Sequence, residues 1–517
     1  MYKMLFKILA LCGTPLVFAQ DCIPVDFGQG SIVCECNSTY CDTYPDPAPP
    51  NEGEFIWYVS SKSGKRLSRS DGKISNELKD GYIVRIDSNR QYQTIHGFGG
   101  AFTDAAGINI KSLSEKSQEN LMRSYFSKDG SKYNLGRIPI GGTDFSTKGY
   151  TYDDHDGDHK LEHFALANED FQYKIPLIKK AQEMNPSLGF LAASWTAPPW
   201  MKNRRRFYGF SYLLDDHYQT YADYILKFLE EYEKNGINIW AVSTGNEPST
   251  SLLPIKRINS MFWSPRTMSK WVIENLGPTL ERSRFNRTNI LMLDDQRFCL
   301  PWFPAYIKNN HKDAFKYIKG IAVHWYADGY YPVGALDATH DLLPDKFILI
   351  TESSIGDRPW DYPKVILGSW SRAELLISKL FENLNHWAVG WVDWNLALNR
   401  TGGPTWVENE IDGPIIVLPE RDSFYKQPMF YAMAHFSKFI PRSSVRLHTS
   451  SENDEILTIA FQTEDEIIVV LLYNQNDQSK NVSIIDGHVG GINVELEGKS
   501  LNTFLYHDKR VSQVSQQ

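Results

Sequence analysis

The sequence has no excess of positive charge. Its 54 Lys and Arg are outnumbered by 62 Asp and Glu, which gives a formal net charge of −8. Nucleic-acid-binding proteins usually have the opposite balance, so we expect no nucleic-acid partner. The 517 residues suggest about three domains of ~150 residues, and a hydrophobic content of 42 % allows a sizeable core.

Several catalytic and binding motifs are also missing. The chain contains no Gly-x-Ser-x-Gly, which argues against an α/β-hydrolase esterase. The glycine-rich residues 97–100 lack the spacing of a dinucleotide-binding fingerprint, because Phe102 stands where the last glycine is required. The acidic residues 153–159 match no complete EF-hand loop, so we expect a solvated loop there.

Long apolar runs are absent after the first twenty residues, whereas a membrane-spanning helix needs about 20 apolar residues. Residues 1–20 have the build of a secretory signal peptide. Lys3 and Lys7 flank the start of an apolar run, and Val17-Phe18-Ala19 offers a cleavage site. We expect a signal peptide over residues 1–19 and a mature chain that is soluble or peripheral in an oxidising compartment.

Cysteine is scarce, with six residues in the chain. Four of them follow the leader closely, at Cys22, Cys34, Cys36 and Cys41. In a secreted chain this cluster indicates two disulfides, with a zinc site as the alternative. Cys299 is expected to be a buried free thiol. N-glycosylation sequons occur at Asn37, Asn286, Asn399 and Asn481, which would place these residues on surface loops.

Short β-type runs lie near both ends of the mature chain. They cover residues 55–58, 82–86, 456–461, 467–473, 482–485 and 503–506. Gly, Asn and Asp separate them, which is typical of a sandwich. We therefore expect one discontinuous β-sandwich, preceded by a proline-rich linker over residues 44–50.

Between these ends, eight apolar runs alternate with helical segments. The runs are residues 95–101, 135–140, 188–193, 237–244, 289–293, 320–325, 347–351 and 389–394. A helix is expected over residues 216–234, since its apolar residues recur at spacings of three and four. Eight such units fit a (β/α)8 TIM barrel, and a helix over residues 429–439 would complete its outer ring.

Two glutamates follow the fourth and seventh of these runs. Glu247 and Glu352 each come directly after an apolar strand, at the barrel end where enzymes of this fold place their chemistry. Two carboxylates that face one cavity can cleave a glycosidic bond, one by protonating the leaving oxygen and the other by attacking carbon. The alternative is that they cap helices or pair with arginine. The amide of Asn246 beside Glu247 favours catalysis.

The chain resembles the acid glucosylceramidases of glycoside hydrolase family 30 along nearly its whole mature length. The resemblance rests on the cysteine spacing and on residues 97–100, 292–297, 320–326 and 424–431. It implies a retaining hydrolase of glucosylceramide, with Glu247 as the acid/base and Glu352 as the nucleophile. Neither a cofactor nor a metal is expected, because the catalytic pair needs none.

The resemblance also implies further residue roles. Arg137 and Tyr326 would lie beside the carboxylates, and the disulfides would be Cys22–Cys34 and Cys36–Cys41. Glucose contacts are implied for Asp144, Trp195, Asn246, Trp394 and Asn409. By resemblance the enzyme acts in the lysosome lumen, on anionic membranes, with a saposin C-like activator. The alternatives are a family 30 xylosidase or endo-β-1,6-glucanase, or a catalytically silent secreted carbohydrate-binding protein.

A basic and aromatic stretch follows the third barrel run. It contains Lys202, Arg204, Arg205, Arg206, Phe207, Tyr208, Phe210 and Tyr212. It is either an exposed loop with a hydrophobic anchor or a membrane-contact lip, which Trp360 would join. Two departures from the family concern the lipid side: Lys256 and Ile258 stand where aromatic residues are usual, and Ser353-Ser354 replaces Ala-Cys after the nucleophile.

The predicted architecture is an α/β chain of three folded parts after the signal peptide. A small disulfide-bonded N-terminal β domain takes residues 20–46 and 396–427. The discontinuous β-sandwich takes residues 47–90 and 444–517. The catalytic (β/α)8 barrel takes residues 91–395 and 428–443.

Overall fold

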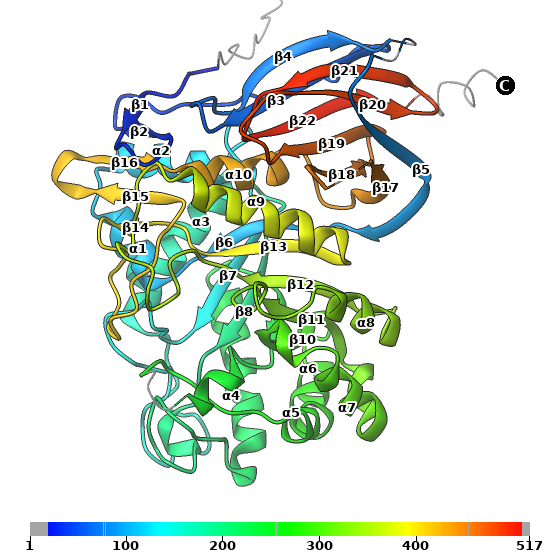
Figure 1. Cartoon of the computed structure of the whole chain (residues 1–517). Coiled ribbons are helices and arrows are strands. Elements are labelled where there is room, and N and C mark those ends of the chain that lie inside the picture. Colours follow the sequence, from blue (N-terminus) through cyan, green and yellow to red (C-terminus); the bar gives the residue numbers. More distant parts are fainter. Residues whose placement is uncertain (1–18, 76, 78, 254–256, 453, 509–517) are drawn as a thin grey trace, which may run out of the picture.

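The computed structural model describes residues 19–508 except 76, 78, 254–256 and 453. The predicted signal peptide therefore lies, apart from Ala19, outside the described residues. Three sheets make up the fold: a closed barrel, a nine-stranded sheet and a five-stranded sheet (Figure 1). Among the helices described, none is both long enough and apolar enough to cross a membrane.

The barrel consists of eight parallel strands in chain order, and β13 closes it against β6. The strands are β6 (Gly97–Ala101), β7 (Leu135–Ile140), β8 (Gly189–Ser194), β9 (Ile239–Ser243), β10 (Asn289–Gln296), β11 (Ile318–His324), β12 (Phe347–Glu352) and β13 (Ala388–Asn395). Each overlaps one predicted run, so the barrel prediction is confirmed. Buried aliphatic side chains such as Leu191, Leu291 and Leu349 pack together as one apolar cluster and leave a filled core instead of a pore.

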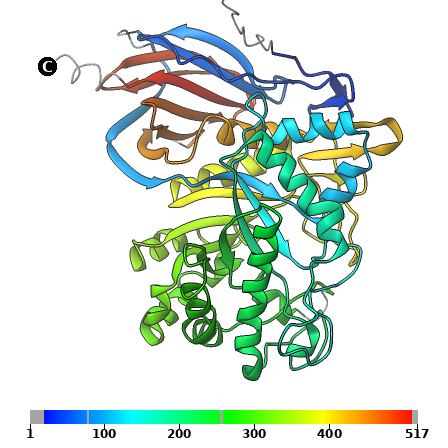
Figure 2. The same ribbon diagram turned by 180° about the vertical axis from the view of Figure 1, so that it is seen from behind.

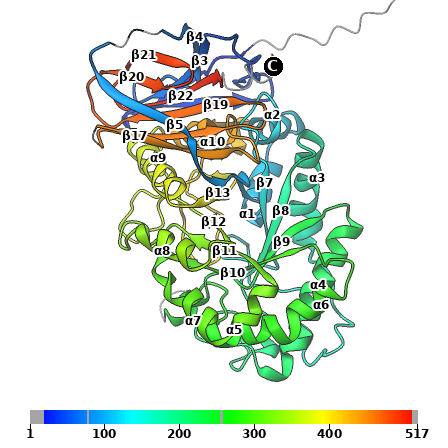
Figure 3. The same ribbon diagram turned by 90° about the vertical axis from the view of Figure 1, so that its right-hand side faces the viewer.

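Helices cover the outside of the barrel (Figures 1 and 3). They are α1 (Asp104–Lys111), α2 (Glu115–Phe126), α3 (Ile175–Met184), α4 (Tyr218–Lys234), α5 (Pro265–Trp271), α6 (Gly277–Glu281), α7 (Trp302–Asn310), α8 (Gly334–Leu342), α9 (Trp370–Asn385) and α10 (Pro428–Ser437). Helix α4 buries Tyr221, Ile225 and Phe228 on one face. Every residue of α10 is buried, because this helix contacts both β6 of the barrel and β22 of the nine-stranded sheet.

The nine-stranded sheet interleaves strands from both ends of the chain in the order β21-β20-β5-β17-β18-β19-β22-β3-β4. Its strands are β3 (Glu54–Ser61), β4 (Ser68–Lys73), β5 (Tyr82–Thr94), β17 (Val445–Ser451), β18 (Ile456–Gln462), β19 (Ile467–Asn474), β20 (Lys480–Asp486), β21 (Gly490–Leu496) and β22 (Ser500–His507). They close around a core that includes Val84, Val470 and Phe504. The predicted discontinuous sandwich is thus confirmed, and Figure 2 shows it beside the barrel.

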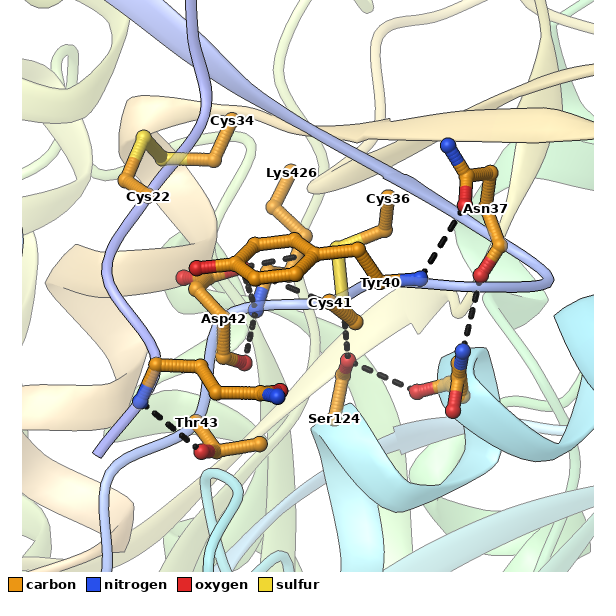
Figure 4. The surroundings of a disulfide bond; sticks show 12 residues. Cys22, Cys34, Cys36, Asn37, Tyr40, Cys41, Asp42, Thr43, Ser124 and Lys426 are labelled. Carbon is orange, nitrogen blue, oxygen red and sulfur yellow. Dashed lines mark hydrogen bonds and ion pairs between the residues drawn. A yellow bond between two sulfur atoms is a disulfide. The ribbon is translucent and has the colours of Figure 1, made fainter. Parts of the chain in front are cut away.

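The five-stranded sheet joins the cysteine-rich segment to the chain after the barrel. Its order is β1 (Pro24–Asp26), β2 (Ile32–Asn37), β16 (Ser423–Lys426), β15 (Ile415–Leu418) and β14 (Leu398–Asn399). The disulfides are Cys22–Cys34 and Cys36–Cys41 (Figure 4). All four thiols of this segment are therefore bonded and none remains as a zinc ligand. Cys299 is buried and free, as expected.

The four sequon asparagines differ in exposure. Asn286 and Asn481 are exposed, whereas Asn37 and Asn399 are half-buried. The side-chain oxygens of Asn37 and Asn399 accept hydrogen bonds of 2.8 Å from the threonine hydroxyls of their own sequons. Glycosylation at these four positions stays a prediction.

Candidate active site

Glu247 lies just beyond the carboxyl end of β9 and precedes the short helix η4 (Pro248–Leu252). Its backbone is left-handed, with φ of 41°, a conformation that is uncommon for non-glycine residues. Gln296 Nε2 donates to its Oε1 at 2.6 Å, and Thr250 Oγ1 donates to its Oε2 at 2.8 Å. The carboxylate is therefore held at both oxygens.

Glu352 is the last residue of β12 and is buried. Arg137 Nη1 donates to its Oε2, and Tyr326 donates to its Oε1 at 2.8 Å. The guanidinium of Arg137 is fully buried and also donates to Asn246 Oδ1 at 2.7 Å and to Asp294 Oδ2 at 2.9 Å. Charge-assisted hydrogen bonds of this kind fix the orientation of Glu352.

The two glutamates converge. One oxygen of Glu247, one oxygen of Glu352 and a ring nitrogen of His324 all lie within 4.8 Å of one another. Retaining glycosidases hold their carboxyl groups about 5–5.5 Å apart, whereas inverting enzymes need about 6.5–9.5 Å to admit a water molecule. A separation of this order fits the retaining class, in which one carboxylate attacks the carbon directly.

His324 links the two glutamates to Asp294. Its Nδ1 lies 3.0 Å from Glu247 Oε1 and its Nε2 lies 3.1 Å from Asp294 Oδ1. Burial lowers the pKa of His324, but the carboxylates of Glu352, Asp294 and Glu247 outweigh it and raise this pKa to about 10.

A cavity of about 840 Å³ opens over these carboxylates. Three of the residues implied as glucose contacts line it, namely Asp144, Trp394 and Asn409, and Tyr326 lines it as well. Asn409 Nδ2 donates to Asp144 Oδ2 at 2.7 Å. Burial and the charge of Glu352 raise the pKa of Asp144 to about 7, so this side chain can either donate to or accept from a hydroxyl group.

Trp195, Asn246 and Arg137 lie behind the cavity wall and are not among its lining residues. The rings of Trp195 and Trp394 stack with centroids 5.1 Å apart. The guanidinium of Arg137 lies 4.9 Å from the Trp195 ring and 5.4 Å from the Trp394 ring. Trp195 therefore supports Trp394 and Arg137 from behind, while Trp394 reaches the cavity.

Sequence reasoning did not single out His324, Gln296 or Thr250. His324 and Gln296 are the last residues of β11 and β10, and the carboxyl end of a barrel strand is the position that could have identified them. Large apolar side chains at the cavity also went unnoticed; Leu252, Leu253, Phe298 and Tyr330 line it and are 53, 46, 41 and 67 % exposed.

Lys202 was predicted to belong to the membrane-contact lip, but it does not lie on the surface. Lys202 is fully buried, and its Nζ donates to Thr196 Oγ1 at 2.5 Å and to the Ser260 carbonyl at 3.2 Å. It cannot face a membrane, because its charge is directed inward. The rest of the stretch is at least partly accessible, Phe207 being half-buried and the others exposed: Arg204, Arg205, Arg206, Tyr208, Phe210 and Tyr212. Trp360 is 69 % exposed.

The residues at which the chain departs from the family pattern differ in their position relative to the cavity. Ile258 is buried and lines the cavity, while Lys256 lies outside the described residues. Ser353 and Ser354 do not line the cavity; their hydroxyls donate to Asp393 Oδ1 at 2.9 Å and to the Asp412 carbonyl at 3.2 Å. The Ser-Ser change therefore affects packing behind the nucleophile.

Comparisons with known proteins identify the family of the chain. The glycosyl hydrolase family 30 TIM-barrel domain matches residues 95–440, and the family 30 beta sandwich domain matches residues 443–504. The mouse lysosomal acid glucosylceramidase is 40 % identical over 94 % of this chain and 96 % of its own. Among solved structures, SrfJ from Salmonella typhimurium superposes with a TM-score of 0.82 at 26 % identity, covering 88 % of this chain and 100 % of its own. An endo-β1,6-glucanase superposes with a TM-score of 0.79 at 27 % identity, covering 88 % and 99 %. The chain belongs to glycosyl hydrolase family 30.

Proposed function

We propose that the chain is a retaining β-glucosidase that hydrolyses glucosylceramide to glucose and ceramide. The observation that carries the proposal is the pair of carboxylates within 4.8 Å of each other over one cavity. The substrate is inferred from the mouse relative, whose name is lysosomal acid glucosylceramidase and which matches along almost the whole chain.

The reaction has two displacements. In the first, Glu352 attacks the anomeric carbon while Glu247 gives its proton to the departing ceramide oxygen, which leaves as the alcohol. In the second, Glu247 takes a proton from water, the water oxygen bonds to the anomeric carbon, and the bond to Glu352 breaks. Glucose leaves with its β configuration, and both glutamates return to their starting states.

The remaining residues divide between the two halves of the substrate. Asp144 and Asn409 would bind glucose hydroxyls, and Trp394 would present an apolar ring to the C–H face of the sugar. Arg137 and Tyr326 would hold Glu352 in position for attack. The exposed apolar side chains around the cavity would accommodate the start of the ceramide: Leu252, Leu253, Phe298 and Tyr330.

The site of action would be the lysosome lumen, at anionic membranes, with a saposin C-like activator. The basic-aromatic loop, which we define as residues 202–214, supports the membrane contact. Arg204, Arg205 and Arg206 could approach anionic headgroups, while Tyr208, Phe210 and Tyr212 could enter the interface. The loop adjoins the cavity through residues 258–262, since Ser260 N donates to the Phe207 carbonyl at 2.9 Å and Ile258 lines the cavity.

A second candidate is hydrolysis of another β-linked sugar, because an endo-β1,6-glucanase shares the fold at 27 % identity. The test has two stages. A mechanism-based glucoside inactivator should label Glu352, which would distinguish an enzyme from a silent carbohydrate-binding protein. Turnover of glucosylceramide should then exceed that of aryl xylosides and β-1,6-glucan. Faster cleavage of the glucan would contradict our assignment and favour the second candidate.

A further inference from the structure

Glu247 is held by different donors at its two carboxyl oxygens. Oε1 accepts from Gln296 Nε2 at 2.6 Å and lies 3.0 Å from His324 Nδ1. Oε2 accepts from Thr250 Oγ1 at 2.8 Å. Which of the two oxygens can carry a proton depends on how many donors each already accepts from.

His324 is a second donor to Oε1. Its Nε2 lies 3.1 Å from Asp294 Oδ1, so both ring nitrogens face carboxylate oxygens. An imidazole can donate to two acceptors only when both of its nitrogens carry protons. Burial lowers the pKa of His324, but the surrounding carboxylates raise it to about 10, which agrees with this state. Nδ1 therefore donates to Glu247 Oε1.

Oε1 of Glu247 has no lone pair left for a proton. A carboxyl oxygen has two lone pairs in the plane of the group, and Gln296 and His324 each donate to one of them. Oε2 faces a hydroxyl group, which can donate to an ionised oxygen and can accept from a protonated one. The proton that Glu247 would give to a leaving group is accordingly bound at Oε2.

Thr250 lies on the cavity side of Glu247. It is 9 % exposed and lines the cavity together with Leu252 and Leu253, the apolar residues that would accommodate the start of the ceramide. Thr250 belongs to the short helix η4, and its backbone N–H donates to the Glu247 carbonyl at 2.9 Å. Its hydroxyl group is therefore fixed beside Oε2 where the leaving group would lie.

Asp295 connects the residues that hold the two oxygens. Its carboxylate accepts from the backbone N–H and the hydroxyl of Ser249, each at 2.7 Å, and from the backbone N–H of Gln296 at 2.7 Å. Ser249 directly precedes Thr250, and Gln296 is itself the donor to Oε1. Asp295 is 1 % exposed, so these bonds are shielded from water. The donors of both oxygens are thus anchored to one carboxylate.

We infer that Thr250 is a positioning residue for the proposed acid/base: its hydroxyl group holds Oε2 of Glu247 as the oxygen that delivers the proton, and donates to the negative charge that this oxygen gains. As the bond from the anomeric carbon to the leaving oxygen breaks, its electron pair stays on the leaving oxygen and takes up the proton. The electron pair of the O–H bond remains on Oε2. A hydrogen bond to a charged acceptor is stronger than one to a neutral acceptor, so this bond favours the transition state. The inference rests on the proposed function, because it needs a leaving group that Glu247 protonates.

The test compares two glucosides that differ in their need for an acid. An alkyl β-glucoside has a poor leaving group that must be protonated, whereas dinitrophenol leaves as a stable anion. Thr250→Val replaces the hydroxyl by a methyl group of similar size. It should lower kcat/KM for the alkyl glucoside at least about tenfold and leave kcat/KM for the dinitrophenyl glucoside unchanged, which also shows that the variant is folded. Thr250→Ser keeps a hydroxyl group and should retain most of the wild-type kcat/KM for both.

Ser251→Ala is the matched control. It removes a buried hydroxyl of the same short helix, one that donates to the Pro248 carbonyl at 2.7 Å instead of to the Glu247 carboxylate. This variant should leave the ratio of the two kcat/KM values unchanged. Equal losses on both glucosides in Thr250→Val, or an undiminished kcat/KM for the alkyl glucoside, would overturn the role of Thr250.

Neutron diffraction of the wild-type protein tests the position of the proton without a substitution. At a pH low enough to protonate Glu247, a deuteron should be found on its Oε2, and both ring nitrogens of His324 should carry one. A deuteron on Oε1 of Glu247 would overturn the inference. A wild type that hydrolyses neither glucoside would refute the proposed function itself, whereas an active wild type with equal losses in Thr250→Val would refute only the role of Thr250.

Discussion

The side-chain amide of Asn409 donates a hydrogen bond of 2.7 Å to the carboxylate of Asp144. This bond favours the ionised form of Asp144 and opposes the burial that raises its pKa. Asn409→Ala should therefore weaken glucose binding, raising KM for an aryl β-glucoside about ten- to a hundredfold. Asn385→Ala, which removes an amide bound to the Thr458 carbonyl outside the cavity, should leave KM unchanged. Equal KM values for all three proteins would argue against a sugar contact at Asn409.

Glu352→Gln should reduce turnover at least about 10⁴-fold, because an amide cannot form the covalent intermediate. Glu247→Gln should behave differently. It should still release a good leaving group such as dinitrophenol, and then accumulate a glucosyl adduct on residue 352 that mass spectrometry detects. An adduct on any other residue would exclude Glu352 as the nucleophile.

His324 should make stability depend on pH in a predictable direction. Its pKa is raised from 6.5 to about 10 in the folded chain. The stabilisation that His324 adds to the unfolding free energy is therefore fully present below pH 6.5 and is lost as the pH rises through 10. The unfolding free energy of His324→Gln should fall furthest below that of the wild type at acidic pH. Urea unfolding from about pH 5 to about pH 9 measures the difference in unfolding free energy between the two proteins. A difference that stays constant over this range would contradict the raised pKa of His324.

Lys202 should make stability depend on pH in the direction opposite to that of His324. Burial lowers the pKa of Lys202 from 10.5 to about 7. Between these two pH values the unfolded chain therefore binds more protons than the folded chain, and the unfolding free energy of the wild type rises with pH. Lys202→Met should remove this slope and gain relative stability at acidic pH. Lys148→Met, whose side chain is 63 % exposed, is the control and should retain the slope. Loss of the slope in both variants would implicate a different group.

Neutralising the arginines of the basic-aromatic loop should affect the hydrolysis of two substrates differently. Arg204→Gln, Arg205→Gln and Arg206→Gln together should reduce hydrolysis of vesicle-bound glucosylceramide by about fivefold per charge that meets the headgroups. Hydrolysis of a soluble aryl glucoside should be unaffected, since none of the three lines the cavity. Equal losses on both substrates would refute a membrane contact at this loop.

Sequence patterns predicted the barrel strands well because a buried parallel strand is apolar along its length, as β12 and β13 are. Strand β4 escaped prediction because its side chains are polar and mostly exposed; backbone pairing with β3 alone defines it. Strands β17 and β21 were also not predicted.

The residues of the candidate site likewise fall into two groups, those that a sequence pattern could identify and those that it could not. Glu247 and Glu352 could be recognised because each interrupts an apolar run. The bond of His324 to Glu247, the inward direction of Lys202 and the position of Trp195 behind Trp394 depend on contacts between distant segments. Such contacts leave no local pattern in a single sequence.

Strand β5 is paired on both sides by segments made near the end of synthesis, β20 and β17. Roughly 350 residues separate Thr94 from Val445, so at about 5–20 residues per second β5 waits on the order of 20–70 s on the ribosome for its partners. Throughout that interval its hydrogen-bonding edges are open to other chains. Until the last strands emerge, the nascent protein therefore carries an unpaired strand with which other chains can pair.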